Sequence, residues 1–127
     1  MDSPQRKKIL IIDDDPFILD MYVLKFKELG FETETAADGR AGIEKAAMHE
    51  PDVILLDVVM PAMDGFEVLQ KLKAQKRAHP CKIIFLTNFG QKEDVERGVA
   101  LGADDYIIKA HFTPSEVVEK VKGLLSK

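Results

Sequence analysis

The sequence lacks the features that mark secreted, membrane-spanning or nucleic-acid-binding proteins. It has a single cysteine, Cys81, so no disulfide can form within the chain, and we expect a reducing, cytoplasmic location. The apolar run near the N-terminus stops at Asp13, too early for a signal peptide, and no run approaches the roughly 18 apolar residues of a membrane span. The net charge is −4, and without a dense stripe of Lys and Arg we expect no direct binding to nucleic acid.

The length and the missing glycine motifs narrow the fold further. A chain of 127 residues is long enough for one domain with a proper core. We expect a short flexible N-terminus over residues 1–7 and one folded domain over residues 8–127, with no output domain. Neither the Gly-x-Gly-x-x-Gly fingerprint nor a P-loop is present, which argues against dinucleotide and nucleoside triphosphate sites.

Two hydrophobic periods alternate along the chain. Short aliphatic or alternating runs predict five strands, at residues 8–12, 31–35, 52–56, 82–86 and 105–109. Helical patterns follow them, at residues 16–29, from Asp38-Gly39 to Pro51, around Phe66, Leu69 and Leu72, at residues 90–101, and after the capping box "TPSE". The first helix is predicted to bury one face, made of Ile18, Met21, Tyr22, Phe26 and Leu29. Strands that are apolar on both faces and alternate with helices predict an α/β fold with a parallel sheet between helices.

Polar residues stand where the strong strands end. Asp13, Asp14 and Asp15 follow the first strand, Asp57 follows the third, Thr87 and Asn88 the fourth, and Lys109 ends the fifth. The carboxyl ends of strands in an open parallel sheet share one crevice, so we expect these side chains to converge there. Carboxylates packed this closely resist being charged together, and a hard dication such as Mg²⁺ removes that conflict.

A carboxylate beside Mg²⁺, a lysine and a hydroxyl suits phosphoryl transfer. Asp57 could attack phosphorus in line and become an acyl phosphate. Mg²⁺, Lys109 and the Thr87 hydroxyl would then stabilise the three phosphoryl oxygens. In this interpretation the buried strand holds Asp57 rigidly, and the turn after it supplies a backbone carbonyl to the metal.

The motifs "IIDDDP", "LLDVVMPAMDG", "FLTN" and "GADDYIIK" together resemble a response regulator receiver domain of two-component signalling, over nearly the whole chain. The resemblance implies a three-layer flavodoxin-like (βα)5 sandwich with the strand order 2-1-3-4-5. It also assigns roles: Asp13 and Asp14 as the acidic pair for Mg²⁺, Asp57 as the phosphoacceptor, Val59 as a carbonyl ligand of the metal, Thr87 and Tyr106 as the switch pair, and Lys109 as the phosphate-binding lysine.

The resemblance implies a phosphorylation-dependent signalling switch. A sensor histidine kinase or histidine phosphotransfer protein would be the donor. The face of the fourth helix, fifth strand and fifth helix would then bind a downstream protein or a second copy of the chain. Such a domain catalyses only its own phosphorylation and dephosphorylation, so we do not expect an enzyme with an external product. A pseudo-receiver that signals without phosphate is the alternative. An Asp-based phosphatase would need an acid at Val59, which argues strongly against that class.

Three departures from the family pattern bear on the site. Ala110 stands where a proline usually follows the lysine, which leaves the Lys109–Ala110 bond either trans or a costly cis bond. Asn88 replaces a small residue and either narrows the donor's path or adds a hydrogen bond. Val59 and Phe89 are apolar where polar residues help to position the hydrolytic water, so we predict slow autodephosphorylation. Outside the site, Asp15 and Asp64 are predicted to cap helices.

Overall fold

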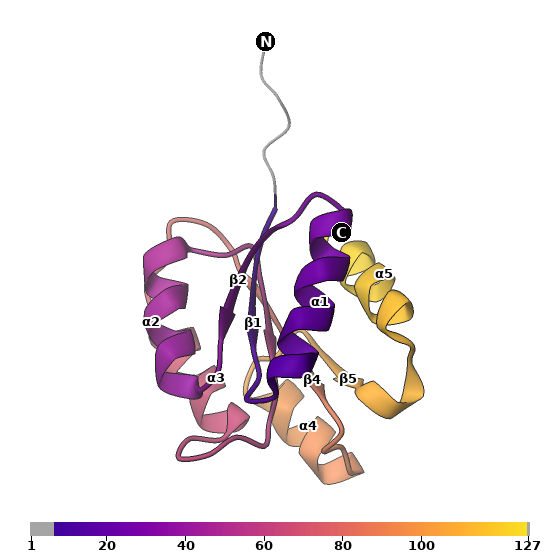
Figure 1. The fold of residues 1–127 in the computed structure, drawn as a ribbon. Helices are drawn as coiled ribbons and strands as arrows, with labels where there is room; N and C mark the ends of the chain where they lie inside the picture. Colours follow the sequence, from indigo (N-terminus) through magenta and orange to yellow (C-terminus); the bar gives the residue numbers. More distant parts are fainter. Residues whose placement is uncertain (1–6, 127) are drawn as a thin grey trace.

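Five parallel strands form one sheet in the order β2-β1-β3-β4-β5, in a computed structural model that describes residues 7–126 (Figure 1). The strands are β1 (Lys8–Ile12), β2 (Glu32–Ala36), β3 (Val53–Leu56), β4 (Lys82–Thr87) and β5 (Asp105–Ile108). The helices are α1 (Pro16–Glu28), α2 (Gly39–His49), α3 (Gly65–Ala74), α4 (Lys92–Ala100) and α5 (Pro114–Leu125). The predicted fold class and strand order are therefore confirmed.

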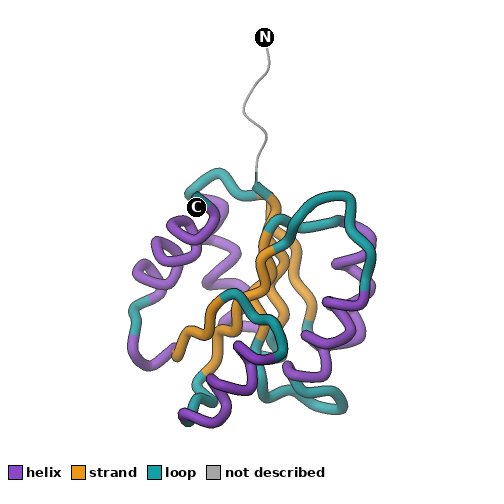
Figure 2. The backbone as a smooth tube through the Cα atoms, turned by 180° about the vertical axis from the view of Figure 1, so that it is seen from behind, coloured by secondary structure: helices purple, strands orange, loops and turns teal. Residues whose placement is uncertain are grey.

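The helices cover both faces of the sheet, because successive side chains of a strand point to opposite faces. In β1, Ile9 and Ile11 pack with α1 and α5, whereas Leu10 and Ile12 pack with the helices of the other face. The strands β3 and β4 alternate in the same way. Figure 2 shows the strands between the two helical layers. Every central strand thus has two buried faces, which explains its continuous aliphatic sequence.

The predicted face of α1 is correct except at its C-terminal end, since Tyr22 and Phe26 are buried and Ile18 and Met21 pack partly buried against the core. Its buried residues are Leu19, Tyr22 and Phe26, whereas Leu29 is 39% exposed. Leu29 only caps the helix, since Gly30 turns the chain away with a φ of +86°. The prediction therefore included a residue beyond the helix end and missed Leu19.

Several element ends also differ from the predicted ones by one or two residues. β2 begins at Glu32, and α4 begins at Lys92 because the backbone N–H of Gln91 bonds the Asp94 carboxylate at 3.1 Å and so starts the helix there. β5 ends at Ile108, and Lys109 instead opens a short 3₁₀ helix, η1 (Lys109–His111). The predicted flexible N-terminus, residues 1–7, lies outside the described residues except for Lys7. No helix within residues 7–126 is long and apolar enough to cross a membrane.

The loop between β3 and α3 is built around Gly65. The Gly65 backbone N–H donates to the Val58 carbonyl at 2.7 Å, so the loop folds back on the end of β3. A Cβ atom at Gly65 would lie 2.7 Å from the Val58 Cα and still closer to the Asp57 carbonyl oxygen. Only glycine allows this approach, and Asp64 before it caps α3, as predicted, by accepting from the Glu67 N–H at 2.9 Å.

We predict that Gly65→Ala lowers the free energy of unfolding by about 2 kcal/mol, because a backbone clash cannot relax by a side-chain rotation. Gly123→Ala is the matched control: an added Cβ there meets nothing within 4 Å in the last turns of α5. That variant should be neutral or up to about 1 kcal/mol more stable than the wild type. Urea denaturation measures both, and equal stability of the two variants would contradict this account of the loop.

Candidate functional site

Backbone pairing brings Asp13 and Asp57 to the same edge of the sheet. Ile12 of β1 is in register with Leu56 of β3, and each acid is the next residue of its chain. The Asp57 N–H donates to the Ile12 carbonyl at 3.0 Å, and the Asp13 N–H donates to the Ala36 carbonyl at 3.1 Å. The ladder therefore continues to both acids, and their positions are fixed by the sheet.

Lys109 reaches into this edge from η1. Its Nζ lies 2.8 Å from Asp13 Oδ2 and 3.8 Å from Asp57 Oδ2, and its side chain is only 14% exposed. No peptide bond between residues 7 and 126 is cis, so the Lys109–Ala110 bond is trans. The structure thus brings Lys109 to the acids without the cis bond that a proline would favour.

Burial sets the electrostatics of the edge. Asp13 is 3% exposed and Asp57 is 9% exposed. Burial raises the pKa of the Asp13 carboxyl, against the hydrogen bonds from Lys109 and the Asp15 N–H that lower it, and the nearby Asp57 charge raises it further. Burial wins this balance, so the site without a metal holds negative charge at a cost.

Asp14 completes a cluster that can hold a divalent cation. One carboxylate oxygen from each of Asp13, Asp14 and Asp57 lies within 4.8 Å of the other two. Asp14 is exposed, which leaves one side of the cluster open to water. Oxygen ligands on one side and water on the other match the preference of Mg²⁺. The raised pKa of Asp13 fits the same reading, because a cation would relieve the buried charge.

Thr87 and Tyr106 lie on the neighbouring strands β4 and β5. Thr87 is 1% exposed, and its Oγ1 accepts a hydrogen bond from the Phe89 N–H at 3.1 Å. The buried Tyr106 packs against Phe85, and its hydroxyl donates to the Phe89 carbonyl. Burial raises the pKa of Tyr106 to about 12, so the hydroxyl stays protonated and able to donate. Both residues of the predicted pair therefore contact the backbone of Phe89.

The link through Phe89 is the part of the site that sequence reasoning missed. The atoms that Thr87 and Tyr106 use are the Phe89 N–H and carbonyl, which every residue type has, so no sequence signal pointed to them. The Phe89 side chain itself is 43% exposed.

The remaining predicted residues lie around this edge. Asp15 caps α1 by accepting from the Phe17 N–H at 2.9 Å, as predicted. Asn88 is exposed, and Val59 is 58% exposed with its side chain in solvent. That the Val59 carbonyl binds the metal stays a prediction.

The fold and this edge define a doubly wound α/β domain with an acidic crevice where the strand order reverses. The chain belongs to the response regulator receiver domain family of two-component systems, whose family model matches residues 9–122.

Two curated relatives are transcriptional regulators. The alkaline phosphatase synthesis transcriptional regulatory protein PhoP of Bacillus subtilis is 40% identical over 95% of this chain and 49% of its own length. The DNA-binding dual master transcriptional regulator RpaA of Synechocystis is 38% identical over 94% of this chain and 49% of its own length. The chain thus spans about half the length of these relatives.

Solved structures agree with the family. A CheY-like response regulator receiver domain protein from Methanospirillum hungatei superposes with a TM-score of 0.87 at 33% identity, covering 96% of this chain and 95% of that one. The chemotaxis response regulator CheY4 of Vibrio cholerae gives a TM-score of 0.86 at 33% identity, covering 94% and 99%. The resemblance seen in the sequence is confirmed.

We predict that Asp13→Asn stabilises the metal-free protein at neutral pH. A raised native pKa means that the protonated form of Asp13 favours folding, so its contribution to stability is present below pH about 4 and is lost as the pH rises through the native pKa. The gain of the variant should therefore be largest near pH 7 and vanish below pH about 4. Urea denaturation in a chelator at several pH values measures it.

Two comparisons complete this prediction. Asp20→Asn, at an exposed position of α1, should stay within about 0.5 kcal/mol of the wild type. Mg²⁺ at ten times its Kd should stabilise the wild type by about 1.4 kcal/mol and the Asp13→Asn variant much less. A variant less stable than the wild type at pH 7 without metal would mean that the Lys109 pair outweighs the cost of burial.

Proposed function

We propose that Asp57 accepts a phosphoryl group from a histidine of a sensor kinase or phosphotransfer protein, and that the modified domain changes its partner. The observation that carries this proposal is the position of Lys109 Nζ, between Asp13 at 2.8 Å and Asp57 at 3.8 Å, beside an open carboxylate cluster. Acids, a cation and a buried hydroxyl on one rigid edge are the groups that phosphoryl transfer requires.

The covalent step needs only groups at this edge. A carboxylate oxygen of Asp57 forms a bond to phosphorus while the bond between phosphorus and the donor's imidazole nitrogen breaks, and the imidazole keeps the electron pair. The sheet fixes the position of Asp57 for an in-line attack on phosphorus. The Val58 N–H donates to Asp57 Oδ1 at 2.7 Å, which leaves Oδ2 as the attacking oxygen. Lys109 donates to one phosphoryl oxygen as the negative charge moves.

Mg²⁺ fits the remaining side of the site, with Asp13, Asp14, Asp57 and the Val59 carbonyl as its proposed ligands. When bound, the ion supplies positive charge to the phosphoryl oxygens. Asp13 would then contact two cations, the metal ion and Lys109, because the Lys109 ammonium group already donates to Asp13 Oδ2. The Thr87 hydroxyl would donate its proton to a phosphoryl oxygen. That proton is available, because Thr87 Oγ1 accepts from the Phe89 N–H and the hydroxyl donates to no group within residues 7–126.

The signal would leave the site through Thr87 and Tyr106. Movement of the Thr87 hydroxyl toward the phosphoryl group disturbs its bond to Phe89, and Phe89 in turn holds Tyr106. Tyr106 packs against Gly98 of α4, so the face made by α4, β5 and α5 changes with it. The exposed Val99 lies on that helix and supports docking of a downstream protein or a second copy there.

The proposed catalysis is confined to the domain's own phosphorylation and dephosphorylation. The expected cytoplasmic location of the protein stays a prediction. Several relatives of about twice this length are named as transcriptional regulators, which supports a partner or linked segment that carries the output.

We predict that a small acyl-phosphate donor with Mg²⁺ adds one phosphoryl group to the wild type. Intact mass spectrometry after an acid quench measures the adduct. Asp57→Asn and a chelator should each abolish it, because they remove the nucleophile and the metal. Asp20→Asn is the matched control and should keep it. An adduct on Asp57→Asn would overturn the assignment, and its absence from the wild type, with a histidine-kinase donor as well, would favour the pseudo-receiver.

We also predict that the Asp57 acyl phosphate is long-lived, because the exposed apolar side chains of Val59 and Phe89 offer no hydrogen bond to an attacking water. Val59→Asn adds such a group, and one hydrogen bond of about 1 kcal/mol in the transition state would speed hydrolysis roughly fivefold. The decay of the adduct mass with time compares the two proteins. Rapid loss from the wild type, or no change in the variant, would contradict the role given to these side chains.

A further inference from the structure

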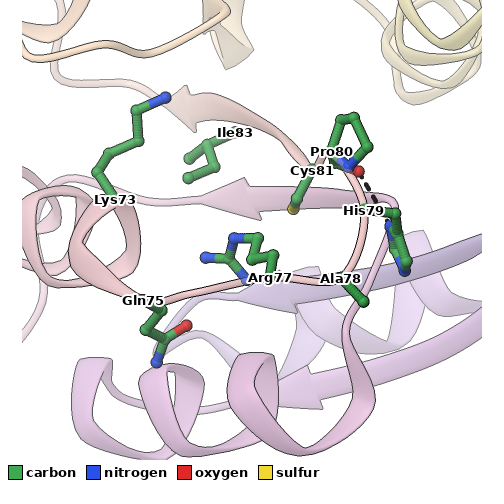
Figure 3. Close-up of a pocket in the computed structure, with 8 residues that line it drawn as sticks. All are labelled: Lys73, Gln75, Arg77, Ala78, His79, Pro80, Cys81 and Ile83. Atoms are coloured by element: carbon green, nitrogen blue, oxygen red, sulfur yellow. Dashed lines mark hydrogen bonds between the residues drawn. The ribbon is translucent and has the colours of Figure 1, made fainter.

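A hollow of about 470 Å³ lies at the opposite edge of the sheet from the acidic cluster. It is formed where α3 ends and the chain enters β4, and Cys81 and Ile83 are among the residues that line it (Figure 3). Ile83 is near the start of β4, whereas Thr87 of the acidic edge ends the same strand. The two sites are therefore separated by the length of one strand.

Positive charge is concentrated around this hollow. From residue 68 to residue 92 the sequence has no Asp or Glu, although the whole chain has a net charge of −4. Residues 71–82 alone contain five Lys or Arg residues and one histidine. Three of these side chains, Lys73, Arg77 and His79, line the hollow. His79 Nδ1 lies 3.9 Å from the Asp52 carboxylate, so the charge that can attract an anion comes from Lys73 and Arg77.

Two of these cations have no carboxylate partner among residues 7–126. Neither Lys73 nor Arg77 forms an ion pair there, and Arg77 uses one nitrogen to bond the Leu72 carbonyl at 2.8 Å. Three nearby acids each accept from a backbone N–H: Glu50 from Ala78 at 3.0 Å, and Asp52 from Lys8 and Asp104 from Ile83, each at 2.8 Å. Most donors of the two cations thus remain available to a ligand.

Gln75 adds an acceptor for which residues 7–126 supply no donor. Its Nε2 donates to the Ile43 carbonyl of α2 at 2.9 Å, which fixes the amide because a carbonyl can only accept. Its Oε1 is buried and has no hydrogen-bond partner within the described part of the chain. Figure 3 shows this oxygen on the side of Arg77 and the nitrogen turned toward the helix below. A buried acceptor without a hydrogen bond destabilises the protein, and a ligand donor would remove that cost.

We propose that this hollow binds a phosphorylated small molecule. The phosphate would bind Lys73 and Arg77, and a hydroxyl or N–H group of the same ligand would donate to Gln75 Oε1. The volume is within the range of small-molecule pockets, and Cys81 and Ile83 supply apolar contacts. A guanidinium fork with an ammonium group suits a phosphate dianion. A donor group separate from the phosphate, as in a sugar phosphate or nucleotide, leaves the phosphate oxygens to the two cations, which favours such a ligand over inorganic phosphate. This site does not depend on the phosphorylation of Asp57.

The experiment is a ¹H–¹⁵N NMR titration of the full chain in a chelator, with inorganic phosphate, glucose 6-phosphate and AMP as probes. We expect saturable shifts of the amides of residues 73–83 with at least one of the organic phosphates, and weaker binding of inorganic phosphate. Arg77→Gln should weaken binding at least tenfold, because hydrogen bonds to a charged group are the strong ones. Gln75→Leu should remove the preference over inorganic phosphate.

Lys76→Gln is the matched control, because Lys76 is an exposed neighbour that does not line the hollow. It should bind as the wild type does. Unchanged shifts with all three probes up to millimolar concentration would overturn the proposal. So would equal weakening by Lys76→Gln and Arg77→Gln, which would indicate diffuse charge only, or shifts confined to the edge of Asp57. Unperturbed resonances of the α1 residues verify that each variant is folded.

Discussion

The ion pair between Asp13 and Lys109 is the interaction on which the acidic edge depends. Burial raises the pKa of Asp13, and Asp57 lies close enough to add to that cost. Lys109, at 2.8 Å from Asp13 and 3.8 Å from Asp57, supplies the opposing charge that allows both acids to stay at the ends of buried strands. The pair also joins the first strand to the last, across the whole site.

The sheet fixes the positions of the two acids, and a glycine lets the following loop pack beside them. Backbone hydrogen bonds from Asp13 to Ala36 and from Asp57 to Ile12 continue the ladder past the strand ends, so the sheet holds the backbone of both acids. Gly65 lets the next loop fold directly against Asp57. The opposite edge of the same sheet carries positive charge instead: Lys73 and Arg77, which form no ion pair within residues 7–126, line a hollow there. One strand, β4, connects the two.

The sequence predicted the fold and the convergence of the site for a definite reason. Aliphatic runs that end in acids determine both which strands are central and which end carries the chemistry, so Asp13, Asp57 and Lys109 could be placed together from the sequence. Helix faces were harder: the period of α1 also fits Leu29, and only the turn at Gly30 shows that the helix stops before it. The bonds of Thr87 and Tyr106 to Phe89 could not be predicted, because they use backbone atoms.

The most direct test of this account is the Mg²⁺ affinity of Lys109→Gln compared with that of the wild type, by isothermal titration calorimetry. Lys109 bonds an oxygen of Asp13, which is a proposed metal ligand, so the lysine and the ion share one buried acid. We expect the variant to bind Mg²⁺ several-fold more tightly, because a competing positive charge is gone. Equal or weaker binding by Lys109→Gln would contradict it and would mean that the cluster does not share its charge between the two cations.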